Sequence, residues 1–440
     1  MNHPSFQDPG WYQAVTLIER LALWRAGRGT APNGEENTLL ARRRLENWRV
    51  QPPFTTDAHF ARRLDLDGMG EEEFIHLLGE PIEAIRDRFH TPPAWLTELI
   101  EAFSRPASPE SDALRTTWRD QEIFFLEVIE PLIHQGRECL HRGVQEQIQT
   151  RSELPFDPHT VEDLLFANLP ERLSGMLSRT LVLELNVARL EGVLCGDTPE
   201  ERFQSFSDRL RQPEIALALL QEYPILARQL LTRINHWVAF SLEFLEHLIT
   251  DWEAIRTAFS PEKDPGLLAG VKGGMSDSHR GGRSVLIAEF SSGIRVVYKP
   301  RSLALDLHFQ DLLIWVNERG DHPPFRTLKI IDRGAHGWVE FVSPQSCASA
   351  AEVRRFYERQ GGYLALLYAL RAIDFHFENL MAVGEHPVLL DLEALFHPPF
   401  PGLDLKHADQ LAASTISYSV VGTGLLPHRV WANADSDGID

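Results

Sequence analysis

The feature that most constrains the fold is a change of sequence pattern near residue 260. Before it, apolar residues recur at helical spacing over long stretches, as in residues 225–259. Residues 260–266 form a loop-type run with two prolines and a glycine, and strand patterns begin after it. We therefore predict an α+β chain, with a mostly helical region over residues 1–262 and a strand-containing core over residues 263–440.

Three helices in the first region carry more detailed expectations. Residues 71–78 open with acids and continue as an amphipathic helix. Residues 121–148 have helical periodicity, and Pro131 predicts a kink or break within them. Thr160 and Asp163 resemble a capping box, which predicts the start of a long helix.

The second region has an order of elements typical of a kinase N-lobe that leads into a C-lobe, so we expect lobes at about residues 267–345 and 346–440. A hairpin, a lysine, a helix, two strands and a long helix come before residues 374–393, the segment that contains most of the candidate site residues. The residues that carry these patterns are 284–290 and 294–298 (hairpin), 303–317 (helix), 327–331 and 337–342 (strands) and 349–371 (helix).

Composition narrows the class of protein. A chain of 440 residues favours more than one domain. The net charge of −20 argues against nucleic-acid binding, which requires basic surface. The three cysteines are far apart, so neither a disulfide framework nor a structural zinc site is expected. The sequence shows no signal peptide and no run of 18 apolar residues, and we expect a cytoplasmic protein.

The segment around residues 374–393 has the pattern of a phosphotransfer site. Asp374 is the candidate general base for an attacking hydroxyl, and His376 acts in catalysis or organises the loop. Asn379 and Asp391 supply oxygen ligands suited to Mg²⁺, with Glu393 as a further ligand. In the alternative interpretation, Asp374 caps a turn and Asp391 merely ends a strand.

Two short strands, residues 380–383 and 387–390, join at Gly384 and Glu385. The hairpin returns the second acid toward the first, as in protein kinases. The order Asp-x-His-x-x-Asn is the lipid-kinase-like variant.

Lys299 ends the return strand of the earlier hairpin, where the strand lysine of kinases contacts the phosphates of ATP. Arg301 is a second candidate cation for ATP. Asp306 and Asp311, on the following helix, are both candidate partners of Lys299. A solvated lysine without a role is the alternative for Lys299 alone.

The loop before the hairpin contains Gly281 and Gly282, and paired glycines allow the backbone to approach a phosphate closely. It matches neither the Walker A motif nor the kinase glycine-rich loop, so an ordinary approach to a hairpin is the alternative. Asp277 and His279 add a carboxylate and an imidazole, which suit proton handling or substrate positioning.

Together these blocks resemble the type II lanthipeptide synthetases (LanM family), in their N-terminal dehydratase region. The resemblance covers roughly residues 273–427, and rests on the blocks at residues 276–284, 297–302, 307–310, 337–342, 374–379 and 390–393. It implies a lipid-kinase-like bilobal core that uses ATP and Mg²⁺ to phosphorylate Ser and Thr of a ribosomal precursor peptide bearing a leader. Elimination of the phosphate then yields dehydroalanine or dehydrobutyrine.

By the same resemblance, Lys299, Asp374, His376, Asn379 and Asp391 serve phosphorylation, and Asp277 and His279 belong to the phosphate loop. Family members are about twice as long and end in a zinc-dependent cyclase domain. We therefore expect a truncated or split dehydratase without zinc. A lipid- or small-molecule-type kinase and a non-catalytic peptide-binding fragment are the alternatives.

Overall fold

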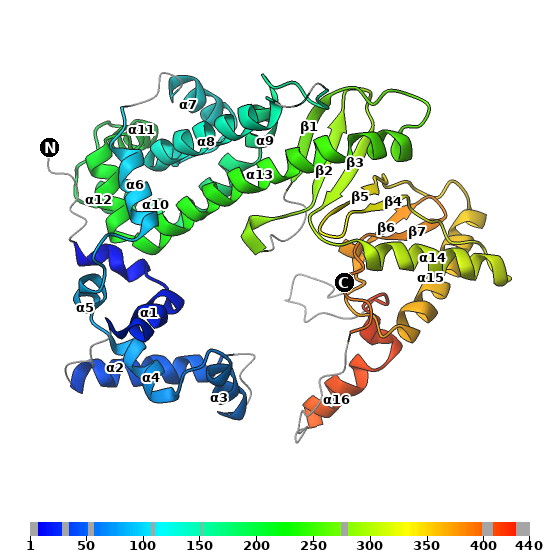
Figure 1. Cartoon of the computed structure of the whole chain (residues 1–440), viewed down its shortest axis with the longest axis horizontal. Coiled ribbons are helices and arrows are strands. Elements are labelled where there is room, and N and C mark those ends of the chain that lie inside the picture. Colours follow the sequence, from blue (N-terminus) through cyan, green and yellow to red (C-terminus); the bar gives the residue numbers. More distant parts are fainter. Residues whose placement is uncertain are drawn as a thin grey trace. The chain divides into compact units, whose positions relative to one another are not determined.

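The computed structural model of the chain describes residues 8–28, 35–51, 57–106, 111–149, 151, 153–273, 280–397 and 408–427. Contacts divide the chain into two compact units, residues 1–151 with 165–244 and residues 152–164 with 245–440. Helix α13 (Pro224–Phe259) contributes residues to both units (Figure 1). The domain boundary predicted at residue 262 stays a prediction.

The described part of the first unit is built of helices around an apolar core that includes Trp11, Leu99, Leu132 and Leu173. A smaller cluster joins three helices near the start of the chain, around Phe60 and Phe74. The helical segments are η1 (Pro9–Ala14), α1 (Leu17–Leu23), η2 (Trp24–Arg28), α2 (Glu35–Arg49), α3 (Asp57–Leu66), α4 (Glu71–Gly79), α5 (Ile82–Asp87), α6 (Ala94–Phe103), α7 (Ser111–Asp120), η3 (Leu126–Ile129), α8 (Glu130–Ile148), α10 (Leu169–Leu190), α11 (Pro199–Leu210) and α12 (Pro213–Glu222).

Of two expectations for this half of the chain, one is confirmed in part and the other was wrong. Residues 121–148 are not one helix: η3 ends at Ile129 and α8 begins at Glu130, so the predicted break near Pro131 is confirmed, whereas a kink within a helix is not. Pro131 lies in the first turn of α8, where the missing N–H leaves no hydrogen bond unmade. Thr160 does not open a long helix. Its hydroxyl donates to the carbonyl of Asp157 at 3.5 Å, and α9 (Val161–Phe166) has only six residues before α10 begins separately.

The second unit combines helices with two antiparallel sheets, so the α+β class is confirmed. The larger sheet has the strand order β1-β2-β3-β5-β4, and β6 pairs with β7 in the smaller one. The strands are β1 (Leu268–Gly273), β2 (Leu286–Phe290), β3 (Arg295–Lys299), β4 (Ile330–Asp332), β5 (Gly337–Glu340), β6 (Leu380–Val383) and β7 (His386–Leu389). The helical segments are η4 (Arg280–Gly282), α14 (Ala304–Arg319), α15 (Ala350–Ala369), η5 (Phe377–Asn379), α16 (Ala408–Ser417) and η6 (Val420–Thr423).

The predicted hairpins and helices of this half are confirmed within two residues at their ends. The strand predicted over residues 327–331 begins later, at Ile330. The amide of Leu328 donates to the side chain of Gln310 at 2.8 Å, and that of Lys329 donates to Glu340 at 3.2 Å. Side chains thus take the hydrogen bonds that would otherwise extend β4.

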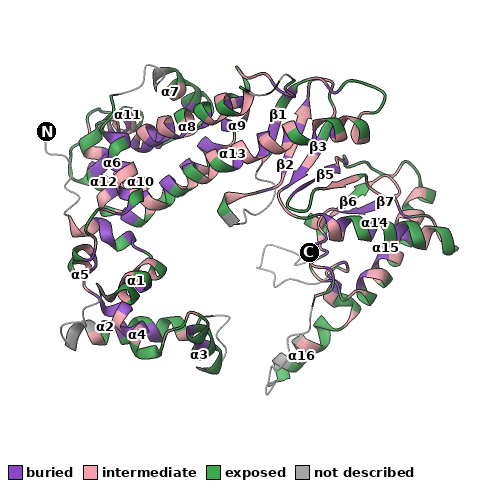
Figure 2. Ribbon diagram, in the orientation of Figure 1, coloured by how far each residue is buried: buried purple, intermediate pink, exposed green. Residues whose placement is uncertain are grey.

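Helices α14 and α15 pack with the β6–β7 hairpin through one apolar cluster, which holds the segment around residue 374 in place. Phe309 of α14, Tyr363 of α15 and Leu389 of β7 are all buried in it, together with Phe375. Figure 2 shows exposed stretches, in green, along both helices.

A buried acid, Asp251, joins the end of α13 to the larger sheet. Its carboxylate accepts from Arg333 at 2.8 Å, Trp338 at 2.8 Å and His336 at 2.7 Å. His247, one turn earlier in α13, stacks on His336 and contacts the hydroxyl of buried Tyr298 at 2.7 Å. Since Tyr298 immediately precedes Lys299, this cluster fixes the strand that carries the lysine.

Burial raises the pKa of Asp251, but hydrogen bonds from Trp338 and His336 and the charge of Arg333 outweigh this effect. The pKa of Asp251 therefore lies below its usual value. A depressed carboxylate pKa stabilises the fold at pH values above the unfolded pKa, about 4. That contribution is lost as the pH falls through the lower pKa of the folded state.

Among the described residues, no helix has both the length and the hydropathy of a membrane span.

We expect Asp251→Asn to lower the free energy of unfolding by about 3 kcal/mol, because it leaves buried donors without their charged acceptor. The loss should be full at pH 7 and should shrink as the pH falls from about 4, the unfolded pKa, through the lower pKa of folded Asp251, where the wild-type acid also becomes protonated. Urea unfolding followed by circular dichroism measures both effects. Glu262→Gln, at an exposed acid beyond α13, is the control and should change the free energy by less than about 0.5 kcal/mol. Equal effects of the two substitutions would contradict the role of Asp251.

Candidate active site

Lys299 is the last residue of β3 and is buried, with 8% of its surface exposed. Its ammonium group donates to the backbone carbonyl of Leu390 at 2.7 Å and lies 3.5 Å from the carboxylate of Asp306. Asp311 instead lies 3.6 Å from His308, so of the two candidate acids Asp306 is the partner of Lys299. The lysine is therefore not a solvated strand end.

Opposing effects act on the pKa of Lys299. Burial lowers its pKa, and the nearby guanidinium of Arg301 lowers it further, whereas Asp306 and Asp391 raise it. The net result is a pKa below the usual value of a lysine. Such an ammonium gains more from a new anionic partner than a hydrated one does, because it has already lost its water.

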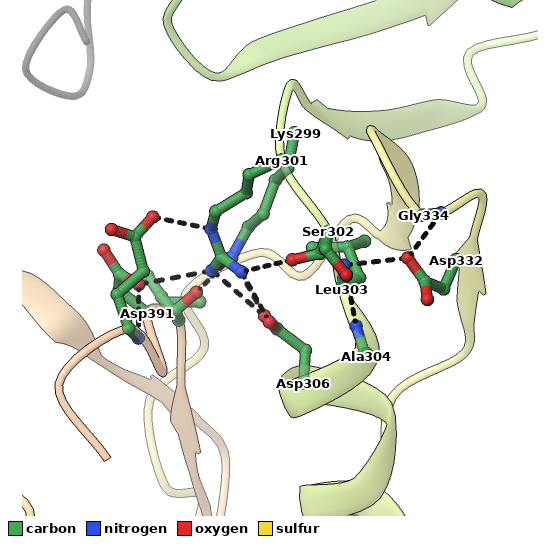
Figure 3. A network of polar contacts seen from close by, with 11 residues as sticks. Lys299, Arg301, Ser302, Leu303, Ala304, Asp306, Asp332, Gly334 and Asp391 are labelled. Carbon is green, nitrogen blue, oxygen red and sulfur yellow. Dashed lines mark hydrogen bonds and ion pairs between the residues drawn. The ribbon is translucent and has the colours of Figure 1, made fainter. Parts of the chain in front are cut away.

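Arg301 connects three acids, as Figure 3 shows for Asp306 and Asp391. Its guanidinium donates to the two oxygens of Asp306 at 2.7 and 3.3 Å and to Asp391 at 3.3 Å. Its Nε lies 2.6 Å from a carboxylate oxygen of Glu393. Arg301 thus joins the segment after β3 to the start of α14 and to the segment after β7.

Burial alone would lower the pKa of Arg301, but the hydrogen bond with Asp306 and the charges of Glu393 and Asp391 raise it overall. The guanidinium stays charged, and it partly neutralises the two acids that the sequence assigns to a metal ion. Asp391 also accepts the amide of Glu393 through the same oxygen, Oδ1, at 3.1 Å.

The β6–β7 hairpin brings Asn379 close to Asp391. Leu380 pairs with Leu389, and just beyond this pair the amide of Leu390 donates to the carbonyl of Asn379 at 2.9 Å. The side-chain amide of Asn379 donates to the carbonyl of Asp374 at 2.8 Å, which leaves its oxygen as an acceptor.

The turn of this hairpin is anchored at its other end by Glu385. Its carboxylate pairs with Arg355 and, at 2.9 Å, with Arg359 of α15. These two hydrogen bonds lower the pKa of Glu385 to about 2. The amide of Gly384 also donates to the carbonyl of Gln345 at 2.8 Å, so the turn is held on two sides.

Asp374 adopts a left-handed backbone with φ of 68°, which is uncommon for a residue with a side chain. Its carboxylate lies 3.2 Å from Nε2 of His376 and is largely exposed. The amide of Phe375 donates to the carbonyl of Thr423 at 3.0 Å and so fixes the loop from the other side. Asp374 and His376 therefore form an accessible carboxylate–imidazole pair on a well-held loop.

Gly281 and Gly282 both have positive φ, 71° and 76°, a conformation that glycine adopts without strain. Asp277 and His279 lie outside the described residues.

The donor set suits a hard cation in its chemistry. Asn379 offers an amide oxygen, and Asp391 and Glu393 offer carboxylates, the ligand types that Mg²⁺ prefers. Among the described residues, no group of three or more His, Cys, Asp or Glu side chains could by itself hold a metal ion. Asp391 and Glu393 are paired with Arg301 in this structure.

Asp332 supports the site although no motif of the sequence indicated it, and Glu385, predicted only as part of a turn, supports the site as well. One oxygen of Asp332 accepts the amides of Leu303, at 2.8 Å, and Gly334, at 3.1 Å, and thereby fixes the start of α14 (Figure 3). The local signal for the Gly334 contact is an acid two residues before a glycine, a common turn pattern. No local signal pointed to the contact with Leu303.

Comparison with known proteins gives two matches. A family model described as a domain of unknown function, DUF4135, matches residues 223–440. The lacticin 481/lactococcin biosynthesis protein LcnDR2 of Lactococcus lactis subsp. lactis is 28% identical over 286 residues. This alignment covers 62% of the chain and 30% of LcnDR2, so the chain spans less than a third of that relative. DUF4135 is itself a domain associated with LanM proteins. Over the region that these matches cover, the chain is similar to type II lanthipeptide synthetases, the LanM family.

Proposed function

We propose that the chain transfers a phosphoryl group from ATP to Ser and Thr hydroxyls of a ribosomal precursor peptide in lanthipeptide biosynthesis. The observation that carries the proposal is the buried Lys299–Asp306 pair in the same unit as Asp374, Asn379 and Asp391. The order of elements around these residues supports a lipid-kinase-like core with two lobes. The LcnDR2 match supports the peptide as substrate.

In the proposed reaction, ATP enters as a substrate and its phosphates replace the carbonyl of Leu390 as the partner of Lys299. Arg301 provides a second positive charge, and the Gly281–Gly282 backbone lies along the phosphates. A phosphate contact compensates the buried ammonium better than a neutral carbonyl does, which favours this exchange.

Asp374 accepts the proton of the peptide hydroxyl while the hydroxyl oxygen forms a bond to the γ-phosphorus of ATP. The bond between that phosphorus and the bridging oxygen breaks, and ADP leaves with the electron pair. His376, 3.2 Å from Asp374, orients the carboxylate. Asn379 supports the loop through its hydrogen bond to the carbonyl of Asp374.

Asn379, Asp391 and Glu393 would hold Mg²⁺, which supplies charge neutralisation for the phosphates when bound. Release of Asp391 from Arg301 would free a carboxylate for this role. We assign Asp277 and His279 to the phosphate loop.

In a following elimination, a base takes the α-carbon proton of the phosphorylated residue, the electrons of that C–H bond form the carbon–carbon double bond, and the β-carbon–oxygen bond breaks. Phosphate leaves, and dehydroalanine or dehydrobutyrine remains. A leader segment of the peptide would keep successive hydroxyls near the site and make each step effectively intramolecular. The need for ATP suits the cytoplasm.

The first test of this proposal is mass spectrometry of a Ser/Thr-rich precursor peptide, encoded beside the gene of this chain, after incubation with ATP and Mg²⁺. A gain of about 80 Da shows phosphorylation and a loss of about 18 Da shows complete dehydration. Asp374→Asn should reduce either product at least about 100-fold, because the proton acceptor is lost while asparagine still tolerates the left-handed backbone.

Asp321→Asn, an exposed acid in the loop after α14, is the control and should leave the rate within about twofold. An unmodified peptide in every condition would count against the proposed activity. Full activity of Asp374→Asn would remove Asp374 as the base.

A second test compares the two acids of α14. Asp306→Asn leaves two cations without their buried acid, so we expect a loss of about 3 kcal/mol in the free energy of unfolding. We also expect kcat/KM for ATP to fall by more than about tenfold, with most of the change in KM, because Lys299 and Arg301 lose their positions. ATP titrations and thermal unfolding measure these effects.

Asp311→Asn is the matched control on the same helix, since Asp311 is exposed and lies beside His308. It should change kcat/KM by less than about twofold. Identical behaviour of Asp306→Asn and Asp311→Asn would rule out the assigned role of Asp306.

A further inference from the structure

A cavity of about 440 Å³ borders His376 in the second unit. Side chains from α15, the loop after it, β6 and the segment after η6 line it. Most of the lining is apolar or aromatic, including Tyr357, Leu364, Phe375, Phe377, Leu380 and Leu425. Its size falls in the range of small-molecule and side-chain binding sites.

Two aromatic rings at this cavity remain open to solvent. Tyr357 is 66% exposed and Phe377 is 64% exposed. Phe377 directly follows His376, which itself lines the cavity and lies 3.2 Å from Asp374. Exposed aromatic side chains gathered beside a polar site commonly mark a binding surface.

Building on the proposed function, we infer that this cavity binds an apolar side chain of the acceptor peptide, next in sequence to the Ser or Thr that is phosphorylated. Successive residues of an extended peptide are about 3.3 Å apart along the chain. When the acceptor hydroxyl is held at Asp374, the next residue therefore lies close to the site. The cavity begins at His376, so a flanking side chain reaches it while the hydroxyl stays at the carboxylate. Burial of that side chain positions the hydroxyl for attack.

The nucleotide base is a less suitable occupant. The cation expected to hold the phosphates, Lys299, is bound to Asp306 and the carbonyl of Leu390. None of these three residues lines the cavity, whereas His376, which lies 3.2 Å from Asp374 on the acceptor side of the reaction, does. If the cavity held the nucleotide base, filling it would weaken ATP binding. If it holds a peptide side chain, filling it should leave ATP binding unchanged.

Gly361 allows the cavity to be filled without disturbing the fold. It lies within α15, lines the cavity, and a Cβ built on it has no atom within 4 Å. The adjacent Gly362 is unsuitable, because its Cβ would lie 2.6 Å from the ring of Phe325. Leucine also has a higher helix propensity than glycine, so Gly361→Leu should fold at least as stably as the native chain.

The experiment measures kcat and KM of Gly361→Leu with two synthetic peptides that differ only in the residue after the acceptor Ser, which is Leu or Gly. We expect KM for the Leu peptide to rise about tenfold, the effect of losing one buried leucine side chain. KM for the Gly peptide and for ATP should stay within about twofold. Gly175→Leu, at an exposed glycine of α10 with equally open space, is the matched control and should change neither peptide.

Equal effects on both peptides, or a raised KM for ATP alone, would overturn the inference. A binding measurement without ATP tests the cavity assignment separately from the proposed activity. It uses the two peptides labelled with a fluorophore. A Leu preference that Gly361→Leu abolishes supports the cavity assignment even where no phosphate is transferred. Absence of phosphate transfer by the native chain bears on the proposed function alone.

Discussion

The candidate site depends on the ion pairs that the carboxylate of Asp306 forms. This carboxylate is almost fully buried, and it binds both Lys299 and Arg301. A buried acid requires partners, so the end of β3 and the start of α14 constrain one another. Arg301 extends this network to Asp391 and Glu393, and the position of the segment after β7 follows from it.

The two cations have different consequences for chemistry. Lys299 is held by one acid and one neutral carbonyl, an arrangement in which an incoming anion improves the balance of charge. Arg301 is already surrounded by acids, so it keeps Asp391 and Glu393 near each other before any cation arrives. The network therefore preorganises the acids and leaves the lysine ready for exchange.

Much of the second unit could be predicted from the sequence, because hairpins and amphipathic helices are encoded by local patterns. The partner of Lys299 could not, since Asp306 and Asp311 share one helix and only its packing selects between them. The late start of β4 also depends on distant side chains, Gln310 and Glu340. Local patterns likewise indicated Asp374, Asn379 and Asp391, whereas the left-handed backbone of Asp374 follows from contacts made by the folded loop.

The anchoring of Glu385 has a consequence for how this region can change during evolution. The β6–β7 hairpin is fixed at its turn by Arg355 and Arg359 and at its open end by the hydrogen bond between Asn379 and Leu390. A strand held at both ends cannot absorb an inserted or deleted residue without reversing which side chains face the core. The hairpin thus acts as a spacer, and we expect a change in the number of residues between Asn379 and Asp391 to be tolerated less well than a substitution.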